Sequence, residues 1–180
     1  MRRFAATSLA AVLLASNASA LTYTISVPLG ITGGQETPPN ASAGSGTLTG
    51  TYDDATNIMT WSGTFTGLGS NTTNAHFHGP ADVGEGPAPV TEGITAANGD
   101  IFPLGVTSGS YSGSANATTI SDTDEAQFLA GLWYINIHTV NFGGGEIRGQ
   151  VAFTAVPEPP TIALLLLGLL GLVRAGRRRS

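Results

Sequence analysis

The sequence predicts an all-β domain arranged as a Greek-key β-sandwich, with a targeting segment at each end. Three observations lead to this prediction. Runs of alternating residues recur between the two ends, turn-forming residues separate them, and only one segment of this middle part has the features of a helix; a hydrophobic helix is expected in the carboxy-terminal segment. With 180 residues, and a segment to remove from either end, the chain has room for one domain of ordinary size.

The expected strands follow from the alternation of large and small polar residues. Early strands are predicted at residues 21–27, 46–52 and 58–68, and Asp53–Asn57 has the composition of a hairpin turn. Later strands are predicted at residues 74–78, 101–106, 109–115, 132–139 and 146–154. About seven or eight short strands with one brief helix are typical of a sandwich.

The one predicted helix spans Ser121–Gly131. Ser121 is a suitable cap, Asp124 and Glu125 favour the amino end, and Gly131 ends the helix. Residues 33–46 and 79–98 are predicted to be loops. The second loop carries Asp82 and Glu85, and loops held by a rigid sheet are where binding sites usually lie.

Charge is distributed unevenly along the chain. Six of the seven basic residues lie at the two ends, so Arg148 is the only cation between Leu21 and Val156, where eleven acidic residues leave a formal charge of −10. This part of the chain has no basic patch that could neutralise phosphates, which excludes nucleic acid as a partner. Divalent cations or sugar hydroxyls suit such a surface better. The chain has no cysteine, so packing and hydrogen bonds must stabilise it.

Residues 1–20 have the features of a signal peptide. A short basic start precedes an apolar, alanine-rich run, and Ala18-Ser19-Ala20 has the form that signal peptidase accepts. Cleavage after Ala20 is therefore expected, which makes signal peptidase the first partner. An uncleaved anchor is the alternative, but the apolar run is short for a bilayer.

Residues 156–180 form a tripartite tail. Pro157-Glu158-Pro159 precedes an apolar segment at residues 161–173, and an arginine cluster follows. This tail resembles the PEP-CTERM sorting signal. The resemblance implies an exosortase as partner, transient insertion of residues 161–173 in the inner membrane, and delivery of the protein from the outer side of that membrane to the cell surface or extracellular matrix. A permanent membrane anchor is the alternative.

The three histidines of the chain suggest a metal site. His76 and His78 share one face of a predicted strand that Gly79-Pro80 ends, and His138 lies on another alternating run. If these runs are neighbours, three imidazoles converge, which suits one zinc or copper ion. Asp82 or Glu146 would be a fourth ligand or a supporting partner. In the alternative, the histidines are structural and bond backbone carbonyls and Glu146.

Four ordered motifs resemble the CHRD domain. They begin at Glu36-Thr37-Pro38-Pro39, Ala75-His76-Phe77-His78-Gly79-Pro80, Gly131-Leu132-Trp133-Tyr134 and Gly145-Glu146-Ile147-Arg148. The resemblance covers roughly residues 24 to 154, so the predicted domains are 1–20, 21–155 and 156–180. It implies an immunoglobulin-like or superoxide-dismutase-like barrel without an established activity. His76-Phe77-His78 is also similar to the copper-binding strand of copper–zinc superoxide dismutases, but those enzymes need more histidines and a disulfide.

Two functions remain open at this point. The sequence favours a non-enzymatic surface or matrix module associated with exopolysaccharide or surface proteins, because no nucleophile elbow or phosphate-binding loop is present. The alternative is a small metalloprotein that holds one copper or zinc ion on the three histidines.

Arg148 is expected to pair with Glu36 or Glu146, since a lone buried guanidinium is costly. Trp61, Trp133 and Tyr134 are expected in the core, and Glu85 and Glu92 in solvent.

Overall fold

The structure is a computed structural model that describes residues 21–116, 120–157, 167–170, 174 and 176–177. The predicted signal peptide and most of the apolar segment at residues 161–173 lie outside the described residues. Among the residues that are described, no helix has both the length and the apolar character needed to cross a membrane.

The described domain is mostly β, and every strand pairing in it is antiparallel. The strands are β1 (Thr22–Ser26), β2 (Ile31–Thr32), β3 (Ser45–Asp53), β4 (Ile58–Thr66), β5 (Thr72–His78), β6 (Val90–Gly93), β7 (Gly109–Ala115), β8 (Tyr134–Thr139), β9 (Ile147–Gln150) and β10 (Ala152–Ala155). Helix α1 spans Asp122–Leu129, and two short 3₁₀ helices span Gly33–Gln35 and Ala96–Asn98. The prediction of a β-rich domain with one brief helix is confirmed.

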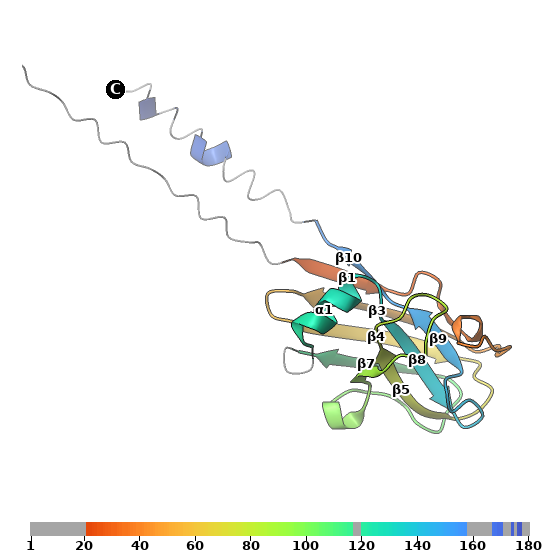
Figure 1. Ribbon diagram of the computed structural model, residues 1–180. Coiled ribbons are helices and arrows are strands. Elements are labelled where there is room, and N and C mark those ends of the chain that lie inside the picture. Colours follow the sequence, from red (N-terminus) through yellow and green to blue (C-terminus); the bar gives the residue numbers. More distant parts are fainter. Residues whose placement is uncertain (1–20, 117–119, 158–166, 171–173, 175, 178–180) are drawn as a thin grey trace, which may run out of the picture.

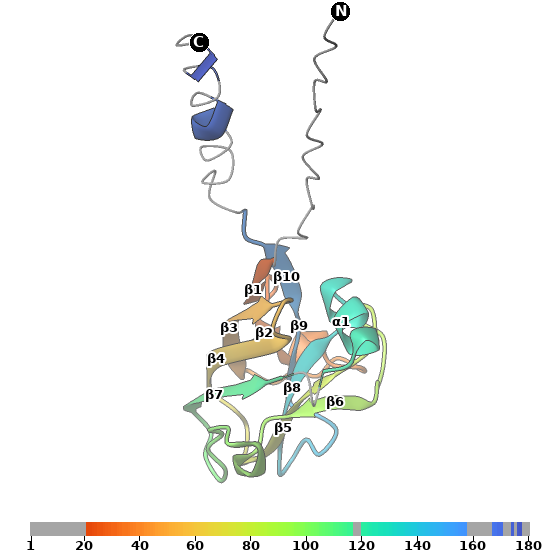
Figure 2. The same ribbon diagram turned by 90° about the vertical axis from the view of Figure 1, so that its left-hand side faces the viewer.

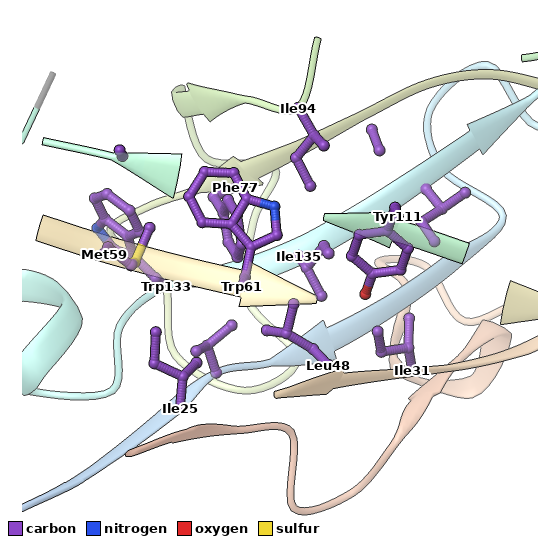
Figure 3. Packing of buried hydrophobic residues seen from close by; sticks show 14 of the residues in the cluster. Ile25, Ile31, Leu48, Met59, Trp61, Phe77, Ile94, Tyr111, Trp133 and Ile135 are labelled. Carbon is purple, nitrogen blue, oxygen red and sulfur yellow. The ribbon is translucent and has the colours of Figure 1, made fainter. Parts of the chain in front are cut away.

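The strands run in the order β10-β1-β3-β2-β9-β8-β5-β6, and β4 and β7 continue outward from β3. Figures 1 and 2 show β3, β4 and β7 as one group of strands and β9, β8 and β5 as a second group. The core lies between them: Trp61 of β4 meets Phe77 of β5 edge-on at a ring-centroid distance of 5.1 Å, beside Ile135 of β8 (Figure 3). Burial of such apolar side chains is the main driving force for this fold.

Local sequence signals explain the turn and the helix. Asn57 adopts a left-handed conformation at φ 52°, as the predicted hairpin between β3 and β4 requires. Ser121 caps α1 through a capping box with Asp124, and Gly131 follows the helix at φ 76°. Exposed residues of β3 also alternate with buried or half-buried ones from Ser45 to Tyr52.

Three predicted boundaries were wrong. Residues 101–106 form no strand, because only Ile101 bridges to Ser112. The predicted loop at residues 79–98 contains β6, which pairs with β5. The predicted strand at residues 146–154 is two strands, β9 and β10, which pair with different neighbours on either side of Val151. Local alternation did not reveal these differences, because they depend on which strands meet in the sheet.

Strand β8 of the second group is buried on both faces, which distinguishes it from a strand of an ordinary half-exposed sheet. All six residues of β8 are buried. Ile135 and Ile137 join the core, whereas Tyr134, Asn136 and His138 alternate with them and are buried as well. The polar face of β8 and β9 therefore forms a buried layer outside the core, and His78 of β5 joins it, whereas His76 of β5 is half-buried.

Candidate metal centre

The three histidines meet on this polar face. His76 and His78 come from β5, and His138 comes from β8, which pairs directly with β5. His76 Nδ1 lies 3.3 Å from His78 Nε2 and 3.1 Å from His138 Nε2. One nitrogen from each ring lies within 4.8 Å of the other two. The predicted convergence of the histidines is confirmed.

Backbone carbonyls fix the orientation of two of the rings. His78 Nδ1 lies 2.9 Å from the Ala88 carbonyl oxygen, and His138 Nδ1 lies 2.9 Å from that of Gly143. A carbonyl oxygen only accepts, so each Nδ1 is the protonated donor, and in the neutral ring Nε2 keeps its lone pair. Both lone pairs face His76 Nδ1, which has at most one proton to offer two acceptors.

This arrangement fits a metal ion. With metal–nitrogen bonds of 2.0–2.1 Å and tetrahedral angles, ligand nitrogens stand ~3.3 Å apart. The observed distances of 3.1 and 3.3 Å between ring nitrogens are close to that spacing. Outer nitrogens bonded to carbonyls are also typical of metal-binding histidines. Three imidazole nitrogens suit zinc or copper and leave a position for a further ligand.

The electrostatics of the site keep the rings neutral, as metal binding requires. Burial lowers the pKa of His76 to about 4, and repulsion from His138 and His78 adds to this effect. Burial also lowers the pKa of His78 and of His138, against the opposing effect of their carbonyl hydrogen bonds. Protons therefore compete weakly for these nitrogens at neutral pH.

The loop of residues 79–89 covers the site, and neighbouring strands hold it in place. Ala88 N–H donates to the Tyr134 hydroxyl at 3.1 Å, and Gln150 Nε2 donates to the Ala81 carbonyl at 2.8 Å. Gly79 N–H donates to the Pro89 carbonyl at 3.1 Å and closes the base of the loop. These bonds place the Ala88 carbonyl at His78.

Arg148 also anchors this loop. Its guanidinium donates to the Glu85 carbonyl at 2.6 Å and to the Asp82 carbonyl at 3.3 Å. It also lies over the Tyr134 ring at 3.5 Å from the centroid, and His78 stacks on the same ring at 5.0 Å. The side chain is 2% exposed. Arg148 thus supports His78 through the loop and through Tyr134.

The expected pairing of Arg148 with Glu36 or Glu146 is present only as an electrostatic attraction to Glu36, without a hydrogen bond to a carboxylate of the described residues. Within the described residues its hydrogen-bond acceptors are carbonyl, hydroxyl and amide oxygens, including Thr37 Oγ1 at 3.2 Å. Glu36 lies close enough for Arg148 to lower its pKa, but burial dominates and raises that pKa to about 7. Carbonyl oxygens of a loop can therefore replace a carboxylate as partners of a buried cation.

Glu146 and Asp82 do not join the histidines. The Glu146 carboxylate is fully buried and accepts from Ser42 Oγ, Gly69 N–H and Thr139 Oγ1, each at 2.6 Å. Asp82 contributes its backbone carbonyl to Arg148, and the group that could hold an ion consists of the three histidines alone among the described residues. Glu146 instead ties two loops to β8.

Sequence reasoning placed several other residues incorrectly or missed them. Trp61, Trp133 and Tyr134 are all buried as predicted, and Tyr134 packs on the polar face of its strand, outside the main apolar cluster. Glu92 was expected in solvent but is 5% exposed and accepts from Asn98 Nδ2, whereas Glu85 is exposed as expected. Asn136 was missed, although its place between Tyr134 and His138 in an alternating strand indicates the same face.

Glu36 and Asn136 form a second polar pair beside the histidines. Asn136 Nδ2 donates to Glu36 Oε2 at 3.3 Å, and Asn136 pairs across the sheet with His76. Glu36 Oε1 and Asn136 Oδ1 are buried without a hydrogen-bond partner among the described residues, and both occupy the space beside Gly145 that a larger side chain would fill. A protonated Glu36 carboxyl would supply the missing donor.

Replacement of Glu36 by Gln is expected to stabilise the fold at pH 8 and to have little effect at pH 4.5. The Glu36 pKa rises from 4.5 to about 7 on folding, so the parent loses stability as the pH rises through this range. A glutamine amide has no proton to lose and can donate to Asn136. The gain at pH 8 should reach at most ~3 kcal/mol.

Urea unfolding of parent and variant at both pH values measures this gain in the free energy of unfolding. The control is Glu85→Gln, which changes an exposed carboxylate. If Glu36→Gln changed the stability equally at both pH values, Glu36 would not be neutral in the folded protein.

Comparisons with known proteins agree with this arrangement of motifs. Residues 155–179 match the PEP-CTERM protein-sorting motif, which implies export, processing by an exosortase and sorting to the cell surface. No curated protein and no solved structure matches the chain. Residues 27–151 match the CHRD domain and include all three histidines and Arg148. This match covers more than half of the chain, which therefore belongs to the CHRD domain family.

Proposed function

We propose that this protein is an exported surface module whose CHRD domain holds one copper or zinc ion on His76, His78 and His138. The observation that carries the proposal is the convergence of three ring nitrogens at 3.1 and 3.3 Å, with two rings oriented by backbone carbonyls. We also propose that the strands form a Greek-key sandwich of the immunoglobulin-like or superoxide-dismutase-like kind.

A purely structural role for the histidines explains less of the geometry. Hydrogen bonds to Ala88 and Gly143 use only the outer nitrogens of His78 and His138. The inner nitrogens then have one shared proton at most, so at least one buried acceptor has no full hydrogen bond, which is unfavourable. An ion that accepts all three lone pairs removes this cost.

Metal binding by the exported protein is the direct test. We expect about one copper or zinc ion per chain, measured by elemental analysis after dialysis, and loss of that ion when the three histidines are changed to Ala. The control is Glu146→Gln, which keeps the histidines but alters a buried acid that does not join them. A parent protein that holds no ion after both metals are offered would contradict the proposal.

The pH dependence of metal release tests the same site independently. Because burial lowers the pKa values of the three imidazoles, and that of His76 to about 4, half-release is expected well below pH 6.5. Without metal, the unfolded chain takes up protons near pH 6.5 and the folded chain only at lower pH, so stability should fall as the pH drops below 6.5. Release centred at pH 6.5 would indicate exposed histidines instead.

Arg148→Met should weaken metal affinity about 10- to 100-fold although Arg148 does not reach the ion. Methionine keeps part of the packing on Tyr134 but cannot hold the Glu85 and Asp82 carbonyls, so the loop no longer fixes Ala88 against His78. The measurement is competitive metal titration, combined with the NMR shifts of the His78 ring. Arg148→Lys should recover part of the affinity.

A control separates this positioning effect from general destabilisation. Leu48→Ala removes a core side chain of β3 that is 2% exposed and far from the loop in the strand order. If Leu48→Ala lowers metal affinity as much as Arg148→Met at a temperature where both remain folded, Arg148 has no specific role in positioning His78.

The two ends of the chain support a route to the cell surface. We infer cleavage by signal peptidase after Ala20, a transient stay of residues 161–173 in the inner membrane, and removal of that segment by an exosortase that recognises Pro157-Glu158-Pro159. The β1 and β10 strands pair with each other, so both processed ends leave from the same end of the domain (Figure 2).

Processing should be visible in the mass of the protein recovered outside the cell. We expect a species that starts at Leu21 and lacks residues 161–180, and a longer species in cells without the exosortase. Intact-mass spectrometry distinguishes the two. Retention of residues 161–180 in cells with an active exosortase would contradict removal and favour a permanent anchor.

A further inference from the structure

A second surface feature lies on the outer face of β1, β3, β4, β7 and β10, away from the histidines. These strands are neighbours in the sheet, and their register aligns hydroxyl residues in rows across them. One row runs through all five strands: Thr154, Thr24, Thr51, Thr60 and Ser114. All five of these residues are exposed.

Two further rows repeat the pattern. Ser26, Thr49, Ser62 and Ser112 form the second row, and Thr47, Thr64 and Ser110 form the third. With strands 4.7–4.9 Å apart, a row across five strands extends ~19 Å. A hollow of about 480 Å³ lies over part of these rows, with Ile101 on its border. We call this surface the hydroxyl face.

The hydroxyl face is uncharged in a domain of strongly negative charge. Within the described strands, the outward positions from Ser45 to Thr51 on β3 and from Thr60 to Thr66 on β4 carry only Ser and Thr. Asp53 marks the end of the face, and its carboxylate accepts from Ala55 and Thr56 in the hairpin turn. A partner of this face should therefore be neutral. The acidic domain would repel an anionic polymer, and the face offers no carboxylate to bind a cationic one.

The hydroxyls retain hydrogen-bonding capacity. Thr47 and Thr64 bond each other at 3.0 Å, and so do Thr51 and Thr60. A hydroxyl has one donor and two acceptor sites, so each pair keeps one donor and further acceptor sites for an outside partner, although Thr47 Oγ1 also accepts from Thr64 N–H at 3.2 Å. Each neutral hydrogen bond contributes little in water, and stable binding therefore requires a ligand that repeats the contact many times.

We propose that the hydroxyl face binds a neutral polysaccharide. Such a polymer presents repeated hydroxyls without charge and is long enough to follow a row of five strands. Protein interfaces, in contrast, use aromatic, Met and Arg side chains at their centres and are poor in Ser. Ice is an alternative ligand for regular rows of hydroxyls, but binding to an ice surface requires a flat array of side chains, whereas sheets of this kind twist. The proposal is independent of the metal site, which lies on β5 and β8.

Affinity electrophoresis of the exported protein in native gels tests the proposal. The probes are dextran and hydroxyethyl cellulose as neutral polymers and alginate as an acidic polymer. We expect at least a two-fold reduction in relative mobility with a neutral polymer and none with alginate. The face variant Thr49→Asp with Ser62→Asp should migrate as if no polymer were present, because it places two charges at the centre of the face.

The matched control is Thr73→Asp with Thr123→Asp, which adds the same charge at exposed positions outside the face and should still be retarded. If the Asp pair does not fold, as judged by circular dichroism, Thr49→Ala with Ser62→Ala replaces it and should reduce the retardation at least two-fold. The proposal would be overturned if the parent and the face variant were retarded equally, or if alginate alone retarded the parent. It would also be overturned if no neutral polymer retarded the parent and the parent instead changed the shape of growing ice crystals.

Discussion

The polar layer depends on how the domain accommodates one buried cation. A guanidinium cannot lose its proton inside a protein, so Arg148 requires acceptors wherever it is buried. Carbonyl oxygens of Asp82 and Glu85 supply them, together with the face of the Tyr134 ring. The loop of residues 79–89 has no regular structure of its own before β6, so these contacts determine its path. The orientation of His78 follows from that path through the Ala88 carbonyl.

Because both faces of β8 are buried, the polar side chains of this strand need hydrogen-bond partners within the protein. Strands buried on both faces usually consist of apolar residues throughout. In β8, polar residues occupy every second position, and each of them must find partners away from water. Tyr134 and His138 do so within the loops, whereas Asn136 Oδ1 remains unpaired beside the unpaired Oε1 of Glu36 among the described residues. A neutral Glu36 resolves this conflict, and its raised pKa agrees with that state.

The sequence indicated the strand face of each histidine because spacing and alternation are local properties, whereas the pairing of β5 with β8 that brings them together was only a condition of the prediction. It also located the hairpin at Asn57 and the capped helix at Ser121, where side chains bond their own backbone. It did not reveal the partners of Arg148, because carbonyl oxygens belong to every residue and leave no signature in a sequence. The same reason explains why Ala88 and Gly143 could not be identified as the groups that orient His78 and His138.

The two proposed sites use the two groups of strands in different ways. On β5 and β8, apolar packing on one face and loop contacts on the other produce a largely buried site that favours neutral imidazoles. On β3 and β4, the outer face has no such cover, so its hydroxyls keep their capacity for solvent or an extended partner. The shared core separates them, since Trp61 and Phe77 pack between the groups. A binding event on one face therefore has no direct contact with the other, and a surface-sorted protein can hold an ion and a neutral polymer at the same time.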